Sequence, residues 1–440
     1  MGIYSTILAS TLGFIIIINE LIRTKKTKPF DIMSGVNLMF FLSFVVTPFS
    51  IYLFNMEFSA WTKLVNVEKY FSIIAIFYVL LGYISILLGT KLSEKWSFVK
   101  KMPSEFNRDD KKLERFAHFI GCIGFFFLFI FIISVGGIEE FFNTNTLYRS
   151  GEVDPVPLAF TRNLAMFIPI SCLIFYGLQK TSNKLINRYQ LFFIIYFIAA
   201  ILLYFNRASR MGLLVFIVGF VLLNVLYYRK SILRYMPIML VVFLFLVFYG
   251  KRIFNYFVVD DFSLKTHGLE VSQIIGEFSF PFFTLTNAIE NSFFNDMPRL
   301  FIDFVLGLVN LLPASIVPFS VPMNATQLNT ESFLNMSGIP MDLISLGFYS
   351  FGISGIILIS LIFGMLIGGI EKILSDKKNL VVMVFYIQFI FFFSLIVPYA
   401  GPTNLFKSDF SLFVSFIVFI FVFNNSSNKT LNNSSKGLKC

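Results

Sequence analysis

Two arginines lie between two long apolar runs in residues 191–228, which read LFFIIYFIAAILLYF (191–205), NRASRMGLL (206–214) and VFIVGFVLLNVLYY (215–228). An α-helix needs about 20 mainly apolar residues to cross the hydrocarbon core of a bilayer. Each run, together with its flanking residues, approaches that length. The stretch therefore predicts two membrane-spanning helices joined by a short polar turn that carries Arg207 and Arg210.

The composition extends this prediction to the whole chain. Of the 440 residues, 57% are hydrophobic and 14% are charged, and the mean hydropathy is +0.79. Water would not tolerate this much apolar surface, so a soluble domain is excluded. A membrane β-barrel is excluded because its alternating segments of about ten residues are missing. The net charge of +10 reflects basic loops beside the apolar runs, which indicates membrane topology rather than nucleic-acid binding.

We therefore predict an all-α polytopic membrane protein with one membrane domain over residues 1–424. Eleven apolar runs are candidates for spans. They cover residues 3–22, 32–54, 71–90, 116–135, 157–178, 189–206, 210–228, 235–250, 345–370, 380–400 and 409–424.

Lysine and arginine in the loops predict the orientation. The basic loops lie at 23–28, 91–115, 180–188, 229–234 and 372–378. The positive-inside rule makes these loops cytoplasmic. The N-terminus is then outside, and the polar tail 425–440 is cytoplasmic and expected to be disordered. The two ends of the chain then lie on opposite sides of the membrane, which requires an odd number of spans.

Residues 251–344 begin outside and must also end outside, so they cross the membrane an even number of times or not at all. This long external segment contains the semi-apolar piece FIDFVLGLVNLLPASIVPF (301–319), which should therefore not cross the bilayer. Its Asp303, Gly307, Asn310 and Pro313 suit an interfacial or re-entrant helix buried against protein. The alternative is a true span with a partner that the pattern does not reveal.

External arginines are unexpected under the positive-inside rule. One interpretation is that they snorkel to lipid headgroups. The other is that they bind an anionic ligand, because the guanidinium donates bidentate, charge-assisted hydrogen bonds to phosphate. The candidates for phosphate binding are Arg207, Arg210, Arg149, Arg162, Arg252 and Arg299.

The stretch NRASRMGLL resembles the Ser-Arg-x-Gly/Ala-Leu-Leu element that opens a span in the O-antigen and capsule polymerases. These are the Wzy-type oligosaccharide repeat-unit polymerases. Residues 299–319 are followed by LNTESFLNMSGIPMDLISLGFYSFGISGIILISLIFGMLIGGIEKIL (328–374). There a Gly-x-Pro segment leads into a Gly-Phe-Tyr-x-Phe-Gly-x-x-Gly helix start, similar to the end of the large external loop in this family. The span count and the position of the loop extend the resemblance over most of the chain.

The resemblance implies a membrane glycosyltransferase that polymerises oligosaccharide units carried on undecaprenyl diphosphate. The reaction takes place at the outer face of the bacterial cytoplasmic membrane, and the product is a surface polysaccharide such as O-antigen, capsule or exopolysaccharide. Partners would be the lipid-linked substrate, membrane lipid, a chain-length co-polymerase and a flippase. The resemblance implies no metal and no other cofactor. The three cysteines are scattered, without a metal-ligand spacing or a disulfide framework.

Such a transfer needs a base near the acceptor hydroxyl. The external candidates are His267, Glu277, Asp296 and Asp342. For His267 the alternative is an ordinary loop residue, and for Glu277 an interface residue beside aromatic rings. Asp342 precedes an apolar run, which also suits a helix cap.

Other residues near the outer face have structural alternatives too. Tyr349 could contact sugar or could belong to the interfacial aromatic belt. Gly347, Gly352 and Gly355 favour close helix packing.

Three other functions remain open at this point. A polysaccharide ligase of the same superfamily would transfer finished polymer to a different acceptor. A coupled transporter would need ionisable groups deep in the spans, and the sequence shows none there. A flippase would need a polar cavity along the whole bundle, and the expected spans are too apolar for one. A non-catalytic scaffold for polysaccharide assembly is the third.

Overall fold

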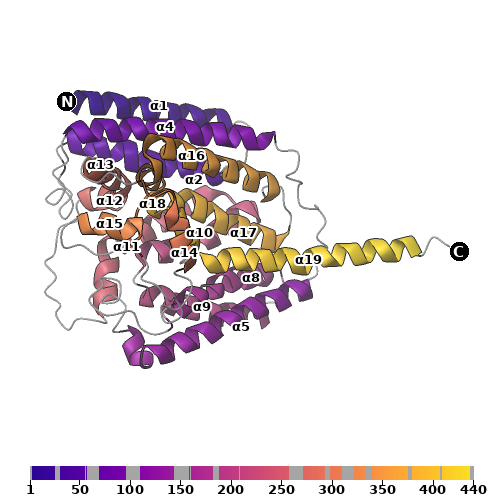
Figure 1. Cartoon of the computed structure of the whole chain (residues 1–440). Helices are drawn as coiled ribbons and strands as arrows, with labels where there is room; N and C mark the ends of the chain where they lie inside the picture. The colour runs from indigo at the N-terminus through magenta and orange to yellow at the C-terminus, as the bar shows by residue number, and fades with distance from the viewer. Residues whose placement is uncertain are drawn as a thin grey trace.

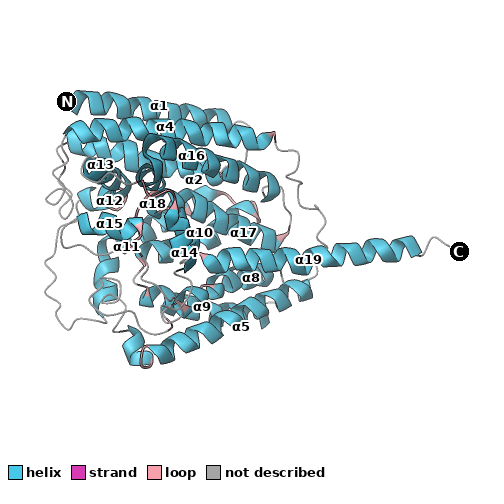
Figure 2. Ribbon diagram, in the orientation of Figure 1, coloured by secondary structure: helices cyan, strands magenta, loops and turns pink. Residues whose placement is uncertain are grey.

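The computed structural model describes residues 2–24, 30–54, 56, 69–95, 110–142, 158, 160–181, 188–207, 209–256, 271–292, 298–309, 322–332, 339–374, 379–406 and 409–436. Every element assigned in these ranges is a helix, as Figure 2 shows. The long helices lie roughly side by side in one bundle (Figure 1). In chain order the elements are α1 (Gly2–Thr24), α2 (Ile32–Phe41), η1 (Leu42–Val46), α3 (Thr47–Tyr52), α4 (Lys69–Glu94), α5 (Asp110–Ser134), α7 (Thr161–Leu164), α8 (Phe167–Thr181), α9 (Arg188–Asn206), α10 (Arg210–Leu226), η2 (Ile232–Arg234), α11 (Met236–Tyr256), α12 (Val271–Gly276), α13 (Phe280–Ser292), α14 (Ile302–Val309), α15 (Ala325–Ser332), α16 (Leu343–Leu374), α17 (Leu380–Phe391), η3 (Phe392–Ile396), α18 (Val397–Ala400), η4 (Pro402–Phe406) and α19 (Phe410–Lys436).

The prediction of a polytopic membrane protein is confirmed. Eight helical segments of the described chain are long and apolar enough to cross a membrane: Ile3–Arg23, Ile32–Tyr52, Phe71–Glu94, Asp110–Ser134, Thr161–Thr181, Arg188–Asn206, Leu343–Leu374 and Leu380–Ala400. Three shorter apolar helices, Arg210–Leu226, Met236–Gly250 and Phe410–Phe423, coincide with the other expected spans. A total of eleven crossings stays a prediction.

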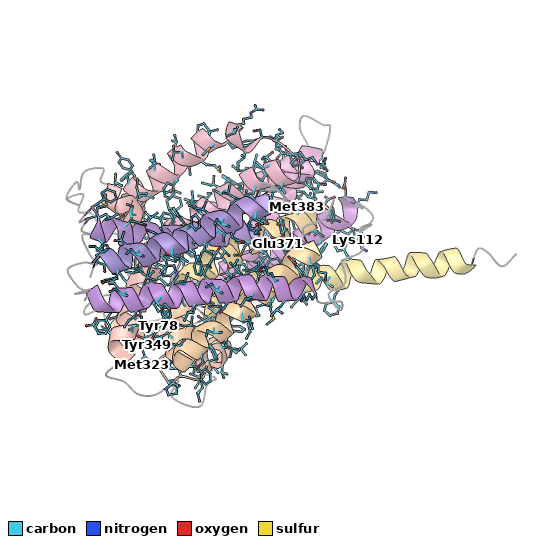
Figure 3. The ribbon with its side chains drawn as sticks, turned by 90° about the horizontal axis from the view of Figure 1, so that it is seen from above. Tyr78, Lys112, Met323, Tyr349, Glu371 and Met383 are labelled. Carbon is cyan, nitrogen blue, oxygen red and sulfur yellow. The ribbon has the colours of Figure 1, made fainter. Side chains whose placement is uncertain are left out.

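The two ends of the bundle differ in what they carry. The N-terminus lies at one end together with α12, α13 and α15, and the C-terminus lies at the opposite end (Figure 1). We refer to these as the amino end and the carboxyl end. Figure 3 places Tyr349 and Met323 at the amino end and Glu371 and Lys112 at the carboxyl end. The N-terminus and the 271–332 helices thus share one side, as the loop charges predict, while the orientation in the membrane stays a prediction.

Small residues hold α4 and α16 in close contact. A Cβ atom added to Gly89 would lie 2.8 Å from the amide nitrogen of Met365, and one added to Gly364 would lie 2.9 Å from the carbonyl carbon of Ile86. Both neighbours are backbone atoms, which cannot move aside as a flexible side chain can. Such small-residue seams let membrane helices approach closely and gain van der Waals contact.

Each of two buried helical segments contains a wide, π-helical turn just before a proline. The π-helix η1 precedes Pro48, and the π-helix η3 precedes Pro398. Proline lacks the N–H that would continue the regular helical ladder. The preceding residue bonds one position farther back instead, as Val397 N does to the carbonyl of Phe392. Both segments therefore remain helical and buried despite a proline near one end.

The helix α16 is broken near its start. Phe351 (φ −150°) and Gly352 (φ 61°) depart from helical geometry, and only glycine adopts the second conformation without strain. A Cβ atom on Gly347 would lie 2.9 Å from the carbonyl oxygen of Gly355, so residues 343–350 fold back against the longer part. The prediction of close packing is confirmed at Gly347 and Gly355 and is wrong at Gly352, where a Cβ atom would meet nothing within 4 Å. The expected span 345–370 thus includes a short folded-back helix, which the hydropathy pattern did not reveal.

The expected interfacial segment 301–319 is only partly described. The helix α14 has eight residues, or roughly 12 Å, which is too short to cross a bilayer by itself. The rest of the segment lies outside the described residues. Two helices continue beyond their predicted ends, α11 to Tyr256 and α19 to Lys436.

Candidate functional site

The turn between α9 and α10 positions Arg210 at the amino end of the bundle. Ser209 caps α10, since its hydroxyl accepts a hydrogen bond from the N–H of Gly212 at 3.1 Å. Arg210 is the first residue of the helix, and its side chain reaches toward α11. A Cβ atom on Gly250 of α11 would lie 2.7 Å from Cδ of Arg210, so that glycine provides the space for the arginine stem.

The guanidinium of Arg210 meets Glu277, which lies in the turn between α12 and α13. The distance from Nη2 of Arg210 to Oε1 of Glu277 is 2.9 Å, and the two side chains are 30% and 25% exposed. Nη1 of Arg210 also donates to the carbonyl oxygen of Val247 at 3.3 Å. A guanidinium has five N–H donors, so these two contacts do not exhaust it.

This ion pair lies at a mostly apolar groove. The groove has about 260 Å³ of empty space, part of it open to solvent, and is lined by Arg210, Met211, Leu214, Phe243, Leu246, Val247 and Glu277. Two residues that the sequence proposed for different tasks, a phosphate-binding arginine and a base, are thus in direct contact. An arginine and a carboxylate beside an apolar lining could bind the charged group of an amphipathic ligand.

Arg207 belongs to a different environment. Its Nη2 donates to Oδ1 of Asn163 in α7 at 3.2 Å. Burial lowers the pKa of Arg207, while the nearby Asp409 and Tyr204 oppose that shift. The guanidinium of Arg162, also in α7, lies 5.7 Å from the centre of the Phe131 ring. These two arginines are therefore held near α7, and neither lines the groove of Arg210.

Arg299 is tied into the late segment. Its Nε and Nη2 bind the two carboxylate oxygens of Asp303 at 2.9 and 3.0 Å. Its backbone N–H donates to the carbonyl of Tyr349 at 3.0 Å, and the N–H of Leu300 donates to the carbonyl of Ser350 at 3.2 Å. The break in α16 frees these carbonyls, and the 299–300 backbone satisfies them. A sugar-binding role for the half-buried Tyr349 stays a prediction.

Asp342 caps α16, which the sequence pattern indicated as the alternative to a role as a base. Its Oδ1 accepts hydrogen bonds from the N–H groups of Ile344 at 2.8 Å and Ser345 at 3.1 Å, and its Oδ2 accepts one from the Ser345 hydroxyl. The side chain is fully buried. Burial raises the pKa of the carboxyl to about 7, although the hydrogen bonds from Ser345 and Ile344 act in the opposite direction. The role of Asp342 as a base in the reaction stays a prediction, and its contacts are those of a cap.

Several predicted residues fall outside the described part of the chain. Arg149, His267 and Asp296 lie in segments that the structure does not describe. Arg252 lies in the last part of α11, and only its backbone is described.

The sequence interpretation missed a polar cluster at the carboxyl end. Glu371 of α16 accepts hydrogen bonds from the N–H of Ile32 at 2.8 Å and from the Tyr386 hydroxyl at 3.0 Å to each oxygen. Beside it, Arg23 binds Asp31, the residue that caps α2. In the sequence each of these charged residues lies at the end of its own span, and no local pattern indicates that they are close together. Only the tertiary structure brings them into contact. Charges removed from water must be paired, so the cluster fastens α1, α2, α16 and α17 to one another.

Within the described ranges, no group of three His, Cys, Asp or Glu side chains lies close enough to hold a metal ion. Comparison with known proteins found no matching family model, no matching curated protein and no matching solved structure.

Proposed function

We propose that this chain is a metal-independent membrane glycosyltransferase that polymerises oligosaccharide repeat units carried on undecaprenyl diphosphate. The reaction would take place at the outer face of the bacterial cytoplasmic membrane, and the loop charges predict that the amino end of the bundle lies at that face. The observation that carries the proposal is the contact between Arg210 and Glu277 over an apolar groove. The resemblance of NRASRMGLL to the repeat-unit polymerases supplies the reaction.

The proposed reaction uses the two side chains in sequence. A lipid diphosphate entering the groove competes with Glu277 for the guanidinium of Arg210, because each phosphate offers bidentate acceptor oxygens and the diphosphate carries two negative charges in all. Glu277 is thereby released and becomes available to accept a proton. The ion pair seen without substrate would thus keep the base occupied until the donor has bound.

The chemical step breaks one bond and forms another. The acceptor hydroxyl attacks the anomeric carbon of the donor sugar and gives its proton to Glu277. The bond between that carbon and the phosphate oxygen breaks, and its electron pair leaves with the diphosphate. Arg210 stabilises the negative charge that develops there. Arg207 and Arg162 near α7, Arg299 in the late segment, and Arg149 and Arg252 are further candidates for contacting phosphate.

The test examines lipid-linked glycans in membranes of cells that carry the complete polysaccharide gene set. We expect Arg210→Ala and Glu277→Gln to lower polymer formation by roughly 10²-fold or more, the usual effect of losing such a group. Single repeat units should accumulate on the lipid outside the membrane. Arg188→Ala is the matched control, since Arg188 also pairs with a carboxylate, Glu114, but at the other end of α9.

Exchanging the charges of Arg210 and Glu277 distinguishes a catalytic role from that of a structural ion pair. If Arg210 and Glu277 act only as an ion pair, the double variant Arg210→Glu/Glu277→Arg should recover activity. We expect it to remain inactive although the protein is present at wild-type level. Accumulation of single units inside the cell would indicate a flippase, accumulation of finished polymer on the lipid would indicate a ligase, and a normal ladder would refute the proposed site.

A further inference from the structure

The polar cluster at the carboxyl end contains more acid than base. Figure 3 places Glu371 at this end of the bundle. Among the described residues of the cluster, Glu20, Asp31 and Glu371 carry carboxyl groups, whereas Arg23 alone carries a positive charge. If every group were ionised, the cluster would hold two negative charges in excess. Asp31 is 4% exposed and the others are partly buried, so such an excess would be strongly unfavourable.

The contacts of Asp31 and Glu20 favour their ionised forms. Asp31 pairs with the guanidinium of Arg23 and accepts the N–H of Ser34 at 2.8 Å. Glu20 accepts hydrogen bonds from the amide of Asn37 and the hydroxyl of Ser34, both at 2.6 Å. Nη1 of Arg23 donates to Glu20 at 3.4 Å. Hydrogen bonds and an opposite charge both stabilise a carboxylate, so these two groups need no proton.

Glu371 receives hydrogen bonds from neutral donors only. The N–H of Ile32 donates to its Oε1 at 2.8 Å, and the Tyr386 hydroxyl lies 3.0 Å from each of its oxygens. Within the described chain, no lysine or arginine forms an ion pair with it. The carboxylate of Asp31, directly before Ile32, acts on Glu371 more strongly than Arg23 does. Of the three carboxyl groups, Glu371 is therefore the one that gains most from a proton.

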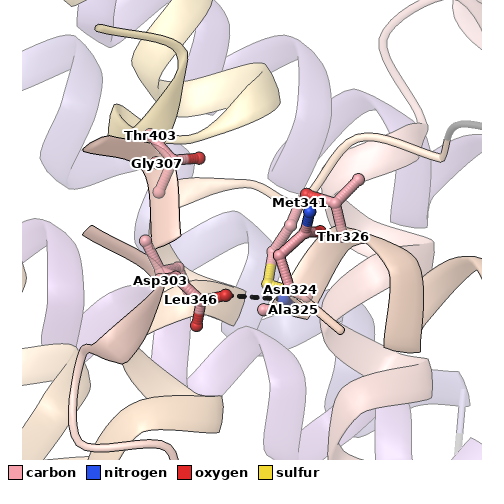
Figure 4. Close-up of a pocket in the computed structure, with 8 residues that line it drawn as sticks. All are labelled: Asp303, Gly307, Asn324, Ala325, Thr326, Met341, Leu346 and Thr403. Atoms are coloured by element: carbon pink, nitrogen blue, oxygen red, sulfur yellow. Dashed lines mark hydrogen bonds between the residues drawn. The ribbon is translucent and has the colours of Figure 1, made fainter. Parts of the chain in front are cut away.

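Asp303 at the amino end shows how a buried carboxylate is balanced elsewhere in the chain. Nε and Nη2 of Arg299 bind its two oxygens at 2.9 and 3.0 Å. The N–H of Ala325 donates to Oδ1 at 2.6 Å, the bond drawn in Figure 4. Glu371 has comparable hydrogen bonds but lacks the guanidinium that neutralises Asp303.

The remaining charged groups beside this part of α16 have other contacts. Lys372, the next residue, donates to the carbonyl of Glu94 at the end of α4 at 3.3 Å. Lys91 in the last turn of α4 is exposed. Inside the cluster, α4 contributes only the neutral hydroxyl of Tyr83. None of these groups offsets a negative charge on Glu371.

We propose that Glu371 holds a proton in the folded chain and is a proton-sensitive fastening between α16 and the start of α2. The neutral carboxyl accepts the N–H of Ile32 and shares a hydrogen bond with the Tyr386 hydroxyl. Release of the proton to water leaves a negative charge beside Asp31, and this loosens the first turn of α2 from α16. The fastening is thus complete at low pH and is lost as the pH rises. It does not depend on the polymerase reaction.

Infrared spectroscopy of the full chain in lipid nanodiscs tests where the proton lies. The signal is the carbonyl stretch of protonated carboxyl groups, recorded in an Asp342→Asn background because burial raises the pKa of Asp342 to about 7. At about pH 6 an ordinary glutamate is only about 2% protonated. We expect Glu371→Gln to remove the intensity of one carboxyl group there. Glu114→Gln is the matched control and should remove none, since Glu114 pairs with Arg188 at the same end.

Tyr386→Phe provides a second variant that leaves the carboxyl in place. It removes the hydroxyl that bonds Glu371, so the band should keep its intensity and shift in frequency. Hydrogen exchange of the Ile32–Gly35 amides measures the fastening itself. We expect these amides to exchange about tenfold faster in the wild type than in Glu371→Gln at about pH 9, and equally fast at about pH 6.

Several results would overturn the proposal. One is a band that Glu371→Gln leaves intact and Tyr386→Phe does not shift. Another is a band that disappears in Glu20→Gln or Asp31→Asn instead, which would place the proton on a different carboxyl group. A band that appears only when Na⁺ and K⁺ are withdrawn would mean that a cation neutralises the cluster. Equal exchange of wild type and Glu371→Gln at about pH 9 would refute the fastening.

Discussion

Asp342 illustrates how one residue can satisfy the pattern of a catalytic base and serve as a helix cap. The carboxyl is fully buried, and three hydrogen bonds from Ile344 and Ser345 surround its oxygens. Its pKa of about 7 results from this burial, against an ordinary value of 3.8. A residue enclosed in this way holds the folded-back part of α16, whatever its further role.

The raised pKa of Asp342 predicts a dependence of stability on pH. The folded chain binds a proton that the unfolded chain releases, so the stabilisation is complete below the ordinary pKa of 3.8 and is lost as the pH rises through about 7. We expect Asp342→Asn, which keeps the cap and cannot ionise, to match the wild type only near pH 4 and below, where the Asp342 carboxyl is protonated in both the folded and the unfolded chain. Above neutral pH it should be more stable by roughly 2–4 kcal/mol. Thermal unfolding in detergent across this range is the measurement, and parallel curves for the two proteins would contradict the prediction.

At the scale of helices, the seam between α4 and α16 gives a matched pair of substitutions. Gly364→Ala would push a Cβ atom against the backbone of Ile86 at 2.9 Å, whereas a Cβ atom on Gly369 of the same helix meets nothing within 4 Å. We expect Gly364→Ala to lower stability by roughly 1–3 kcal/mol through overpacking. Gly369→Ala should be neutral or stabilising by up to about 1 kcal/mol, because alanine favours the helix. Melting temperatures of the two purified variants check this, and equal losses would mean that the seam is not the cause.

The hydropathy pattern predicted most of the helices because length and apolar character decide which segments can lie in lipid. It could not predict the fold of α16, because the residues from Leu343 to Leu374 read as one apolar run although Phe351 and Gly352 break it. The site was predicted in the same partial way. Arg210 and Glu277 were named separately, while their contact depends on how α10, α11 and the 277 turn pack. The cluster around Glu371 had no local signal at all.

At the scale of the whole molecule, the two ends of the bundle carry different chemistry. The amino end holds the Arg210–Glu277 pair and the Arg299–Asp303 pair. The carboxyl end holds the buried cluster of Arg23, Asp31 and Glu371. The helix α16 contributes to both ends, since the carbonyl of Tyr349 accepts the backbone N–H of Arg299 at the amino end and Glu371 belongs to the cluster. The cluster would therefore hold the carboxyl end of α16 fixed.

The orientation of these ends in the membrane is decisive for the proposed function, because the lipid-linked donor is polymerised outside. The loop charges predict that the amino end faces outward. Single cysteines at two exposed positions test this in a background in which Cys122, Cys172 and Cys440 are replaced by serine. Met323→Cys marks the amino end and Lys95→Cys, directly after α4, marks the carboxyl end.

We expect a membrane-impermeant maleimide to label Met323→Cys in intact cells and to label Lys95→Cys only after the cells are opened. Met323 suits the test because its carbonyl, and not its side chain, binds Arg299. The reverse pattern would place Arg210 and Glu277 in the cytoplasm. A donor presented outside could not reach them there, and polymerisation at the outer face would be refuted even if both side chains proved essential.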